Sequence, residues 1–201
     1  VYSGRFYNTD RLVFQNFSRE FGVKIRLIES AGSSLIEKLR RNGPEAKADV
    51  ILLVDVARAS LAKKVGLFQP ITSTKINKLV PRKYRESDGH WFGITKRTRA
   101  IVVNPSLVNI NSIKSYKDLA NPALKGKLCL RNRKSPYNQS LVSDYLISNG
   151  EISTRTWLNG MISNVSQPFF PGDTAIVRAV AMKKCGVGIV NHYYVERMAA
   201  G

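Results

Sequence analysis

Short apolar runs alternate along this chain with segments whose apolar residues recur every three or four positions. The runs at 49–54, 127–130 and 186–190 are typical of buried strands, and the segments between them have the spacing of amphipathic helices. This alternation indicates βαβ units and a mainly parallel sheet. With 201 residues, of which 43% are hydrophobic and 23% charged, the chain can form one large domain or two smaller lobes.

The first part of the chain predicts helices that end at a glycine or an Asn-Gly pair, at residues 10–21, 33–41 and 57–65. Asn8-Thr9-Asp10 are expected to cap the first helix, whose face carries Phe14, Phe17 and Phe21. Alternating apolar residues predict a strand at 23–27. The run at 49–54 is bounded by acids and predicts a strand covered on both faces.

The second part begins after the aromatic segment at 90–94 with an extended stretch at 99–104. Helices are expected around 116–119, 139–147, 154–162 and 173–184, with Asp173 or Thr174 as the cap of the last of these, and a final helix opens at Asn191. We therefore predict two α/β lobes, 1–96 and 97–201, with hinge crossovers near 95–104 and a ligand cleft between the lobes. A single doubly wound sheet is the alternative.

The formal net charge is +18, from 32 Lys and Arg against 14 Asp and Glu. Such an excess suggests nucleic acid as a partner. Yet the basic residues are scattered near the ends of predicted elements, and an anionic membrane or envelope surface would attract the chain equally well. No apolar stretch approaches the length of a membrane span, and Val1-Tyr2-Ser3-Gly4 does not resemble a signal peptide.

Two cysteines occur, Cys129 and Cys185, and their spacing matches neither a zinc motif nor a disulfide framework. We expect two buried thiols inside strands, with a bridge between neighbouring strands as the alternative. The phosphate-binding patterns G-x-G-x-x-G and G-x-x-x-x-G-K-[ST] and the nucleophile pattern G-x-S-x-G are absent. His90 and His192 are far apart in sequence, so no catalytic set can be assembled and no enzyme is expected.

Four tyrosines follow predicted strands or extended segments. Tyr193 and Tyr194 come directly after the run at 187–191, Tyr7 follows the opening segment, and Tyr137 follows the strand at 127–130. Because the carboxyl ends of strands face the ligand crevice of open α/β sheets, the four phenols would form an all-oxygen pocket that suits a hard cation such as Fe3+. Taken singly, each fits an ordinary half-buried tyrosine with a hydrated hydroxyl.

Several tyrosine-bearing and flanking segments resemble one family. They are Tyr2-Ser3-Gly4-Arg5-Phe6-Tyr7-Asn8-Thr9-Asp10, Asp49 to Asp55 with Ala57-Arg58, Gly66-Leu67-Phe68-Gln69-Pro70, Trp91-Phe92-Gly93, Ser135-Pro136-Tyr137-Asn138-Gln139-Ser140, Gly172-Asp173-Thr174 and Asn191-His192-Tyr193-Tyr194. In this order they are similar to the ferric-ion-binding periplasmic substrate-binding proteins of bacterial ABC iron importers, particularly the cyanobacterial type. The resemblance extends over essentially the whole chain.

The resemblance implies a periplasmic, two-lobed, type II-like binding-protein fold that closes on one iron ion and delivers it to an inner-membrane ABC permease. Its metal ligands correspond to Tyr7, Tyr137, Tyr193 and Tyr194. The family continues past Gly201, which implies that the chain lacks a C-terminal portion that completes the first lobe. A monomer is expected, with Fe3+ as the ion and Fe2+ kept open.

The sequence departs from many relatives at Phe6, where they carry a histidine, so any fifth ligand would be water, an anion or another side chain. Four phenolates around Fe3+ leave one negative charge, which Arg97 or Arg197 is expected to offset. Two other functions stay open at this point. One is a related binding protein for an oxyanion or small organic ligand, and the other is a basic nucleic-acid-binding domain.

Overall fold

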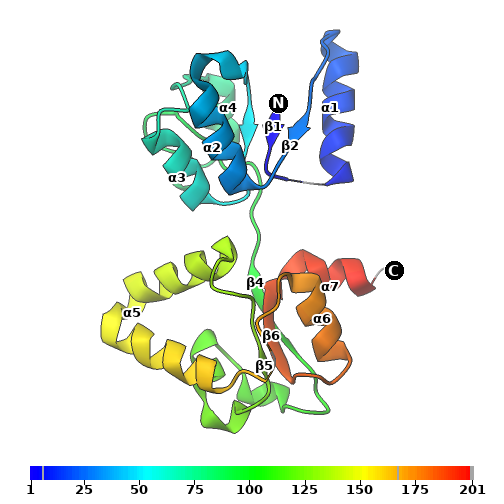
Figure 1. Ribbon diagram of the computed structural model, residues 1–201, viewed down its shortest axis with the longest axis vertical. Coiled ribbons are helices and arrows are strands. Elements are labelled where there is room, and N and C mark those ends of the chain that lie inside the picture. The colour runs from blue at the N-terminus through cyan, green and yellow to red at the C-terminus, as the bar shows by residue number, and fades with distance from the viewer. Residues whose placement is uncertain (6, 167, 200–201) are drawn as a thin grey trace. The chain divides into compact units, whose positions relative to one another are not determined.

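The computed structural model describes residues 1–5, 7–166 and 168–199, without the side chains of residues 33 and 44. Contacts within the chain divide it into two compact units, Val1–Thr95 and Lys96–Gly201 (Figure 1). Each unit has its own three-stranded sheet and its own apolar core. Within the described part, no helix combines the length and the apolar character required to cross a membrane.

The sheet of unit 1 is parallel and has the order β2-β1-β3. The strand β1 (Tyr2–Ser3) lies in the middle, between β2 (Ile28–Glu29) and β3 (Ile51–Leu52). Helices lie between and after these strands along the chain. They are α1 (Asn8–Phe21), α2 (Gly32–Asn42), α3 (Val56–Lys64), α4 (Thr74–Leu79) and the short 3-10 helices η1 (Gly43–Ala46) and η2 (Arg82–Tyr84). Helix α2 supplies Leu35 and Leu39 to a small core around Tyr2.

The strand predicted at 23–27 is not formed, because the residues that pair with β1 come after it in the chain. Strand β1 pairs with its neighbour at Tyr2 and Ser3, and those two positions face Ile28 and Glu29. The run at 49–54 does form a strand at β3, but its residues are half-buried and Val50 is exposed. A two-residue strand at the edge of a small sheet is therefore less covered than the apolar run predicted.

Helix α1 confirms the predicted helix and ends at Gly22, whose φ of 65° is the left-handed conformation that glycine adopts without strain. The capping prediction is wrong, because Tyr7 occupies the N-cap and makes no side-chain cap bond. No side chain of α1 is buried. The Phe17 and Phe21 rings pack on each other with centroids 4.6 Å apart, and a groove of about 740 Å³ runs between α1 and β2.

The sheet of unit 2 has the order β4-β6-β5 and is mixed. The strand β6 (Val187–Asn191) lies in the middle, parallel to β5 (Leu128–Cys129) and antiparallel to β4 (Arg99–Val103). The expectation of a mainly parallel sheet is therefore wrong for β4. The chain enters this unit at the edge where β5 and β6 end, so its first strand runs in the opposite direction to them.

The helices of unit 2 are α5 (Pro136–Ser163), α6 (Asp173–Ala181), α7 (His192–Ala199) and the short 3-10 helices η3 (Ile110–Ser112), η4 (Tyr116–Ala120) and η5 (Pro122–Leu124). Helix α5 contains both helices predicted at 139–147 and 154–162, which meet at a break where Gly150 has φ 77° and ψ 170°. Helix α6 ends three residues before the predicted end, because Lys183 takes a left-handed φ of 61°.

Two apolar layers cover the sheet of unit 2. Leu128, Val187 and Ile189 pack with Trp157 of α5 in one cluster, whereas Val190 packs with α6 in the other. Gly188 lies where α6 approaches the sheet most closely, since a Cβ there would stand 2.4 Å from Cγ2 of Ile176. The close packing of α6 holds its first residue, Asp173, against the end of β6.

Cys129 and Cys185 form a disulfide, so the expectation of two buried thiols is wrong, although both residues are buried. Their Cα atoms are 6.0 Å apart, which is within bridging range. The sequence argument placed both cysteines inside strands. Cys129 is in β5, but Cys185 lies in the loop before β6, and the bridge joins that loop to the neighbouring strand.

Removing the bridge should destabilise unit 2. The two cysteines are 56 residues apart in the sequence, and a closed loop of that size stabilises a fold by about 2–4 kcal/mol, chiefly by restricting the unfolded chain. We expect the Cys129→Ala/Cys185→Ala variant to lose this amount in urea unfolding followed by circular dichroism. The control is dithiothreitol, which should destabilise the parent protein and leave the variant unchanged. A parent protein that resists reductant with no change in midpoint would contradict the expectation.

Candidate functional site

One edge of the unit 2 sheet gathers polar side chains. The parallel strands β5 and β6 end at this edge and β4 begins there, so Arg131, which follows β5, comes together with Asn191 of β6 and Arg99 of β4. Arg131 also lies next to the 168–171 loop, because it pairs with Phe170 in an isolated bridge. Carboxyl ends of parallel strands are where open α/β sheets bind ligands.

Asp173 is the centre of this polar group. Its side chain has 0% exposure, and its carboxylate accepts hydrogen bonds from Arg99 Nη1 at 2.8 Å and from Arg131 Nη1 at 3.3 Å. It also accepts from the backbone N–H of Asn191 at 2.7 Å. One buried carboxylate therefore ties the start of α6 to the ends of all three strands.

Arg99 makes further contacts that leave it little freedom. Its Nη1 donates to Asn191 Oδ1 at 3.0 Å, and its Nη2 donates to Asn138 Oδ1 at 3.1 Å and to the carbonyl of Ile189 at 3.0 Å. Asn138 in turn donates to the carbonyl of Arg131 at 3.0 Å. Because Asn138 is in the first turn of α5, this network fixes the start of that helix beside the sheet edge.

Tyr137 stands directly before Asn138, and its ring lies among three guanidinium groups. The Cζ atoms of Arg97, Arg131 and Arg99 are 4.6, 5.3 and 5.8 Å from the ring centroid. Burial raises the pKa of the Tyr137 phenol, the nearby phenol of Tyr193 raises it further, and Arg97 and Arg131 act in the opposite direction. The phenol is therefore protonated at neutral pH.

Tyr193 and Tyr194 lie in the first turn of α7, immediately after β6. Their ring centroids are 4.6 Å apart, and the hydroxyl of Tyr193 accepts a hydrogen bond of 3.1 Å from Asn191 Nδ2. Asn191, which binds Tyr193, and Asn138, which follows Tyr137, both accept hydrogen bonds from Arg99. Three of the four predicted ligand tyrosines thus belong to one edge of unit 2, and all three are half-buried.

The two arginines singled out from the sequence also contact these tyrosines. Arg97 lies over Tyr137, as described above, and the Cζ of Arg197 is 5.8 Å from the ring centroid of Tyr194. The spacing of one helical turn between Tyr194 and Arg197 thus brings the two side chains together.

His192, between β6 and the tyrosine pair, is held by the segment that leads into β4. Its backbone N–H donates to the carbonyl of Thr98 at 3.1 Å, and its Nδ1 accepts from the backbone N–H of Thr98 at 3.2 Å. The ring also packs edge-on against Tyr193, with centroids 5.7 Å apart. His192 therefore orients the tyrosine pair through its backbone and its ring.

Tyr7 belongs to unit 1. It is half-buried at the start of α1, and the Cζ of Arg5 is 5.1 Å from its ring centroid. Arg5 itself forms a two-pronged ion pair with Asp10, at 2.6 and 3.0 Å. Phe6, the position where the sequence departs from many relatives, lies outside the described residues.

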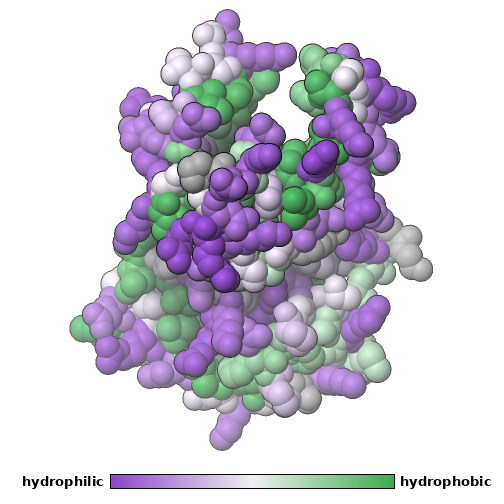
Figure 2. Space-filling model, turned by 45° about the horizontal axis from the view of Figure 1, so that its top comes forward, coloured by the Kyte–Doolittle hydropathy of each residue, from purple (hydrophilic) through white to green (hydrophobic). Residues whose placement is uncertain are grey.

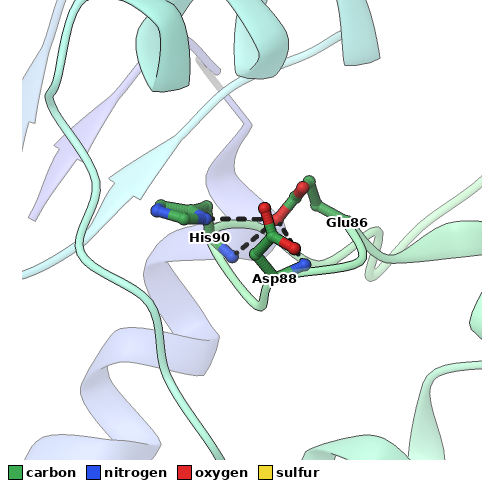
Figure 3. A group of neighbouring side chains, drawn as sticks. All are labelled: Glu86, Asp88 and His90. Atoms are coloured by element: carbon green, nitrogen blue, oxygen red, sulfur yellow. Dashed lines mark hydrogen bonds and ion pairs between the residues drawn. The ribbon is translucent and has the colours of Figure 1, made fainter.

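Unit 1 also contains a group of possible metal ligands in one loop, Glu86, Asp88 and His90 (Figure 3). The ammonium of Lys63 already bridges it, at 2.6 Å from Glu86 Oε1 and 2.9 Å from Asp88 Oδ2. Lys63, aided by the N–H groups of His90 and Asp88, lowers the pKa of Glu86 to about 2. We interpret the group as an ion-pair cluster that closes the loop, since a metal would have to displace Lys63.

Sequence reasoning missed Arg99, Arg131 and Asp173 as members of the site. Asp173 was expected to cap a helix, and Gly172 occupies that position instead. The available signal was positional, since each of these residues stands at the start or end of a predicted element on the edge that carries the tyrosines. The sequence did not indicate in which direction the extended stretch at 99–104 runs, and that direction decides at which end of the sheet Arg99 lies.

Comparisons with known proteins agree with this arrangement. Residues 45–200 match the family described as bacterial extracellular solute-binding protein. The chain belongs to that family. The similarity that the sequence predicted is confirmed by a curated relative, iron uptake protein A1 of Synechocystis, which is 38% identical over 198 residues covering 98% of this chain and 55% of the relative.

Solved structures of family members superpose closely on the chain. The Trichodesmium protein IdiA (FutA), solved with iron and citrate, has a TM-score of 0.91 and 35% identity over 100% of this chain and 63% of its own. The ferric binding protein from Campylobacter jejuni has a TM-score of 0.91 and 30% identity over 97% and 62%. The predicted α/β binding-protein fold is thus confirmed. The chain spans a little over half the length of the curated relatives that it matches.

Removing the carboxylate of Asp173 should destabilise unit 2 strongly. Asp173→Ala leaves two buried guanidinium groups without their shared partner, and breaking a buried ion pair in this way costs about 3–5 kcal/mol. The measurement is urea unfolding of the purified variant. Asp144→Ala, at an exposed position of the same unit, is the matched control and should change stability by less than about 0.5 kcal/mol. Equal effects of the two substitutions would show that Asp173 does not organise the edge.

Proposed function

We propose that this protein binds ferric iron through the phenolates of Tyr7, Tyr137, Tyr193 and Tyr194 and delivers it, in the periplasm, to the permease of an ABC importer. The observation that carries the proposal is the grouping of Tyr137 with the adjacent pair Tyr193 and Tyr194 at one edge of unit 2, where Asn138 and Asn191 both bind Arg99 and Asn191 also binds Tyr193. Tyr7 contributes from unit 1 in this proposal.

Donor chemistry supports a hard, highly charged cation as the cargo. The proposed ligands offer oxygen only, and a free phenol has a pKa of about 10, so an ion must be strongly polarising to displace the protons at neutral pH. Fe3+ meets this requirement better than Fe2+, because each phenolate stabilises the higher charge more. Fe2+ stays a second ion that the same oxygen donors would hold more weakly.

The charge of the residues around the proposed site also fits Fe3+ as the cargo. Four phenolates around Fe3+ have a net charge of −1. At the site edge, Arg99 and Arg131 share the single carboxylate of Asp173, which leaves one uncompensated positive charge near Tyr137. Arg97 over Tyr137 and Arg197 over Tyr194 add further positive charge. We propose Arg97 and Arg197 as the residues that offset charge as the ion arrives or changes oxidation state.

Relatives and the disulfide support the cargo and the compartment. Among the relatives is the Fe(3+)-binding periplasmic protein of Serratia marcescens, 29% identical over 96% of this chain and 56% of the relative. The Cys129–Cys185 bridge suits an oxidising compartment such as the periplasm.

An oxyanion or small organic anion is the second candidate ligand. The observation that favours it is the set of three guanidinium groups around Tyr137, since arginines are the usual partners of carboxylates and phosphates. In that case the tyrosines would donate hydrogen bonds from neutral hydroxyls. Colour separates the two candidates, because ferric phenolate absorbs visible light by charge transfer and a complex with an anion alone does not.

Replacing a ligand tyrosine should remove the colour of the iron-loaded protein. Tyr137→Phe and Tyr194→Phe keep the ring and delete the oxygen that binds the ion, so we expect weaker absorption in the visible band and less bound iron. Tyr84→Phe, at an exposed tyrosine of unit 1, is the control and should change neither. If both ligand variants keep the colour and iron content of the parent protein, the site lies elsewhere.

Acid should release the iron. The pKa of Tyr137 is raised by burial, so the free site is protonated at neutral pH, and each phenol must lose its proton when the ion binds. Affinity therefore falls as the pH falls, by about tenfold per pH unit for each proton released. We expect iron retention, measured after equilibration with a chelator between pH 8 and 5, to decrease steeply, and Tyr137→Phe to show a shallower slope. Retention that is independent of pH would exclude phenolate ligands.

A further inference from the structure

Charge is segregated along unit 1. Residues 56–95 contain eight Lys and Arg and only two acids, Glu86 and Asp88. Both acids are in ion pairs with Lys63, and Glu86 also interacts with His90. The only acids of this stretch are therefore paired with one lysine. Within residues 56–95, no further acid remains to offset the charge of the other basic residues.

Five of those residues form what we term the basic strip, on α4, η2 and the residue that follows: Lys75, Lys78, Arg82, Lys83 and Arg85. The first four are exposed. None of the five forms an ion pair with a carboxylate in the part of the chain that the structure describes. The strip is thus a compact source of uncompensated positive charge.

Large apolar side chains lie beside these charges. Leu79 is 72% exposed, Ile71 53% and Tyr84 37%. Backbone hydrogen bonds hold the segment in one folded piece, since Ile71 N–H donates to the carbonyl of Gly89 at 3.0 Å and Gly93 N–H donates to the carbonyl of Tyr84 at 2.7 Å. Hydrophilic side chains cover most of the face drawn in Figure 2, with apolar patches between them.

Val80 shows which side of the segment packs inward. It follows Leu79 and is 9% exposed, so the helix is fixed to the unit through Val80 and presents Leu79 outward. The ring of Tyr84 lies beneath the ammonium of Lys83, with 5.0 Å between Nζ and the ring centroid. Basic groups and exposed apolar groups therefore alternate along one short, well-anchored segment.

We propose that the basic strip docks the protein onto an anionic lipid surface. Clustered Lys and Arg gain about 1 kcal/mol each near an anionic bilayer, which corresponds to about fivefold in binding per charge. Exposed Leu79, Ile71 and Tyr84 can enter the headgroup region beneath those charges, as the apolar groups of peripheral membrane proteins do. Apolar groups of this size beside the charges favour a bilayer over a soluble polyanion, which offers them no apolar phase.

The test measures binding to vesicles containing phosphatidylglycerol by co-sedimentation, with phosphatidylcholine vesicles as the neutral reference. The strip variant carries Lys78→Gln, Arg82→Gln and Lys83→Gln. Three charges at about fivefold each predict about a hundredfold loss of binding at low salt. The matched control carries Lys125→Gln, Lys183→Gln and Lys184→Gln in unit 2, which lowers the net charge equally and should lose less than about fivefold.

Equal losses in the two variants would mean that net charge alone attracts the protein, and this would overturn the proposal. So would unchanged binding in the strip variant. Both variants should keep the iron content and colour of the parent protein, because neither changes a proposed ligand. The proposal for the docking surface and the proposal for the iron site can therefore be refuted independently.

A second arm tests the apolar part. Leu79→Ser should make the remaining binding more sensitive to salt, since exposed charges are screened over about 10 Å at 0.1 M while apolar insertion is not. Ile147→Ser, at a side chain of unit 2 that is 85% exposed, is the control. A short DNA duplex tests nucleic acid as the partner. If it competes the protein off vesicles at physiological salt, or if Leu79→Ser behaves like the control, the lipid proposal is wrong.

Discussion

The buried carboxylate of Asp173 is the contact on which the second unit depends. Arg99 at the start of β4, Arg131 just after β5 and the backbone N–H of Asn191 in β6 converge on it, and the two arginine side chains are only 10% and 16% exposed. The cost of burying three charges is offset by their mutual hydrogen bonds. The same contacts set the position of Tyr137 through Asn138, and of Tyr193 through Asn191. The stability of unit 2 and the placement of these tyrosines therefore depend on one hydrogen-bond network.

Positive charge has different partners in the two units. In unit 2 an acid is buried beneath the tyrosines, and a surplus of guanidinium groups remains beside the phenols. In unit 1 the acids of the 56–95 stretch are gathered at Lys63, and the surplus lies on the surface. A single number for net charge hides this difference. The +18 of the chain is better described as two local excesses with separate consequences.

Much of the fold could be predicted because helix ends carry strong local signals. Gly22 and Gly150 mark the ends of predicted helices, and both take the left-handed backbone that ends them. Strands were harder, since pairing decides their limits, as the shift from 23–27 to Ile28–Glu29 shows. The tyrosines could be selected by position and chemistry. The disulfide and the ion pairs of Asp173 could not, because each depends on which distant segments meet and in which direction β4 runs.

The hydrogen bonds between Thr98 and His192 couple two segments of unit 2. They join His192, the residue before the tyrosine pair, to the segment through which the chain enters unit 2. One of these bonds joins main chain to main chain and the other uses the imidazole of His192, so a shift of Tyr193 would move the backbone at Thr98 with it. The backbone that leads into β4 and the start of α7 are therefore positioned together, by the same pair of residues.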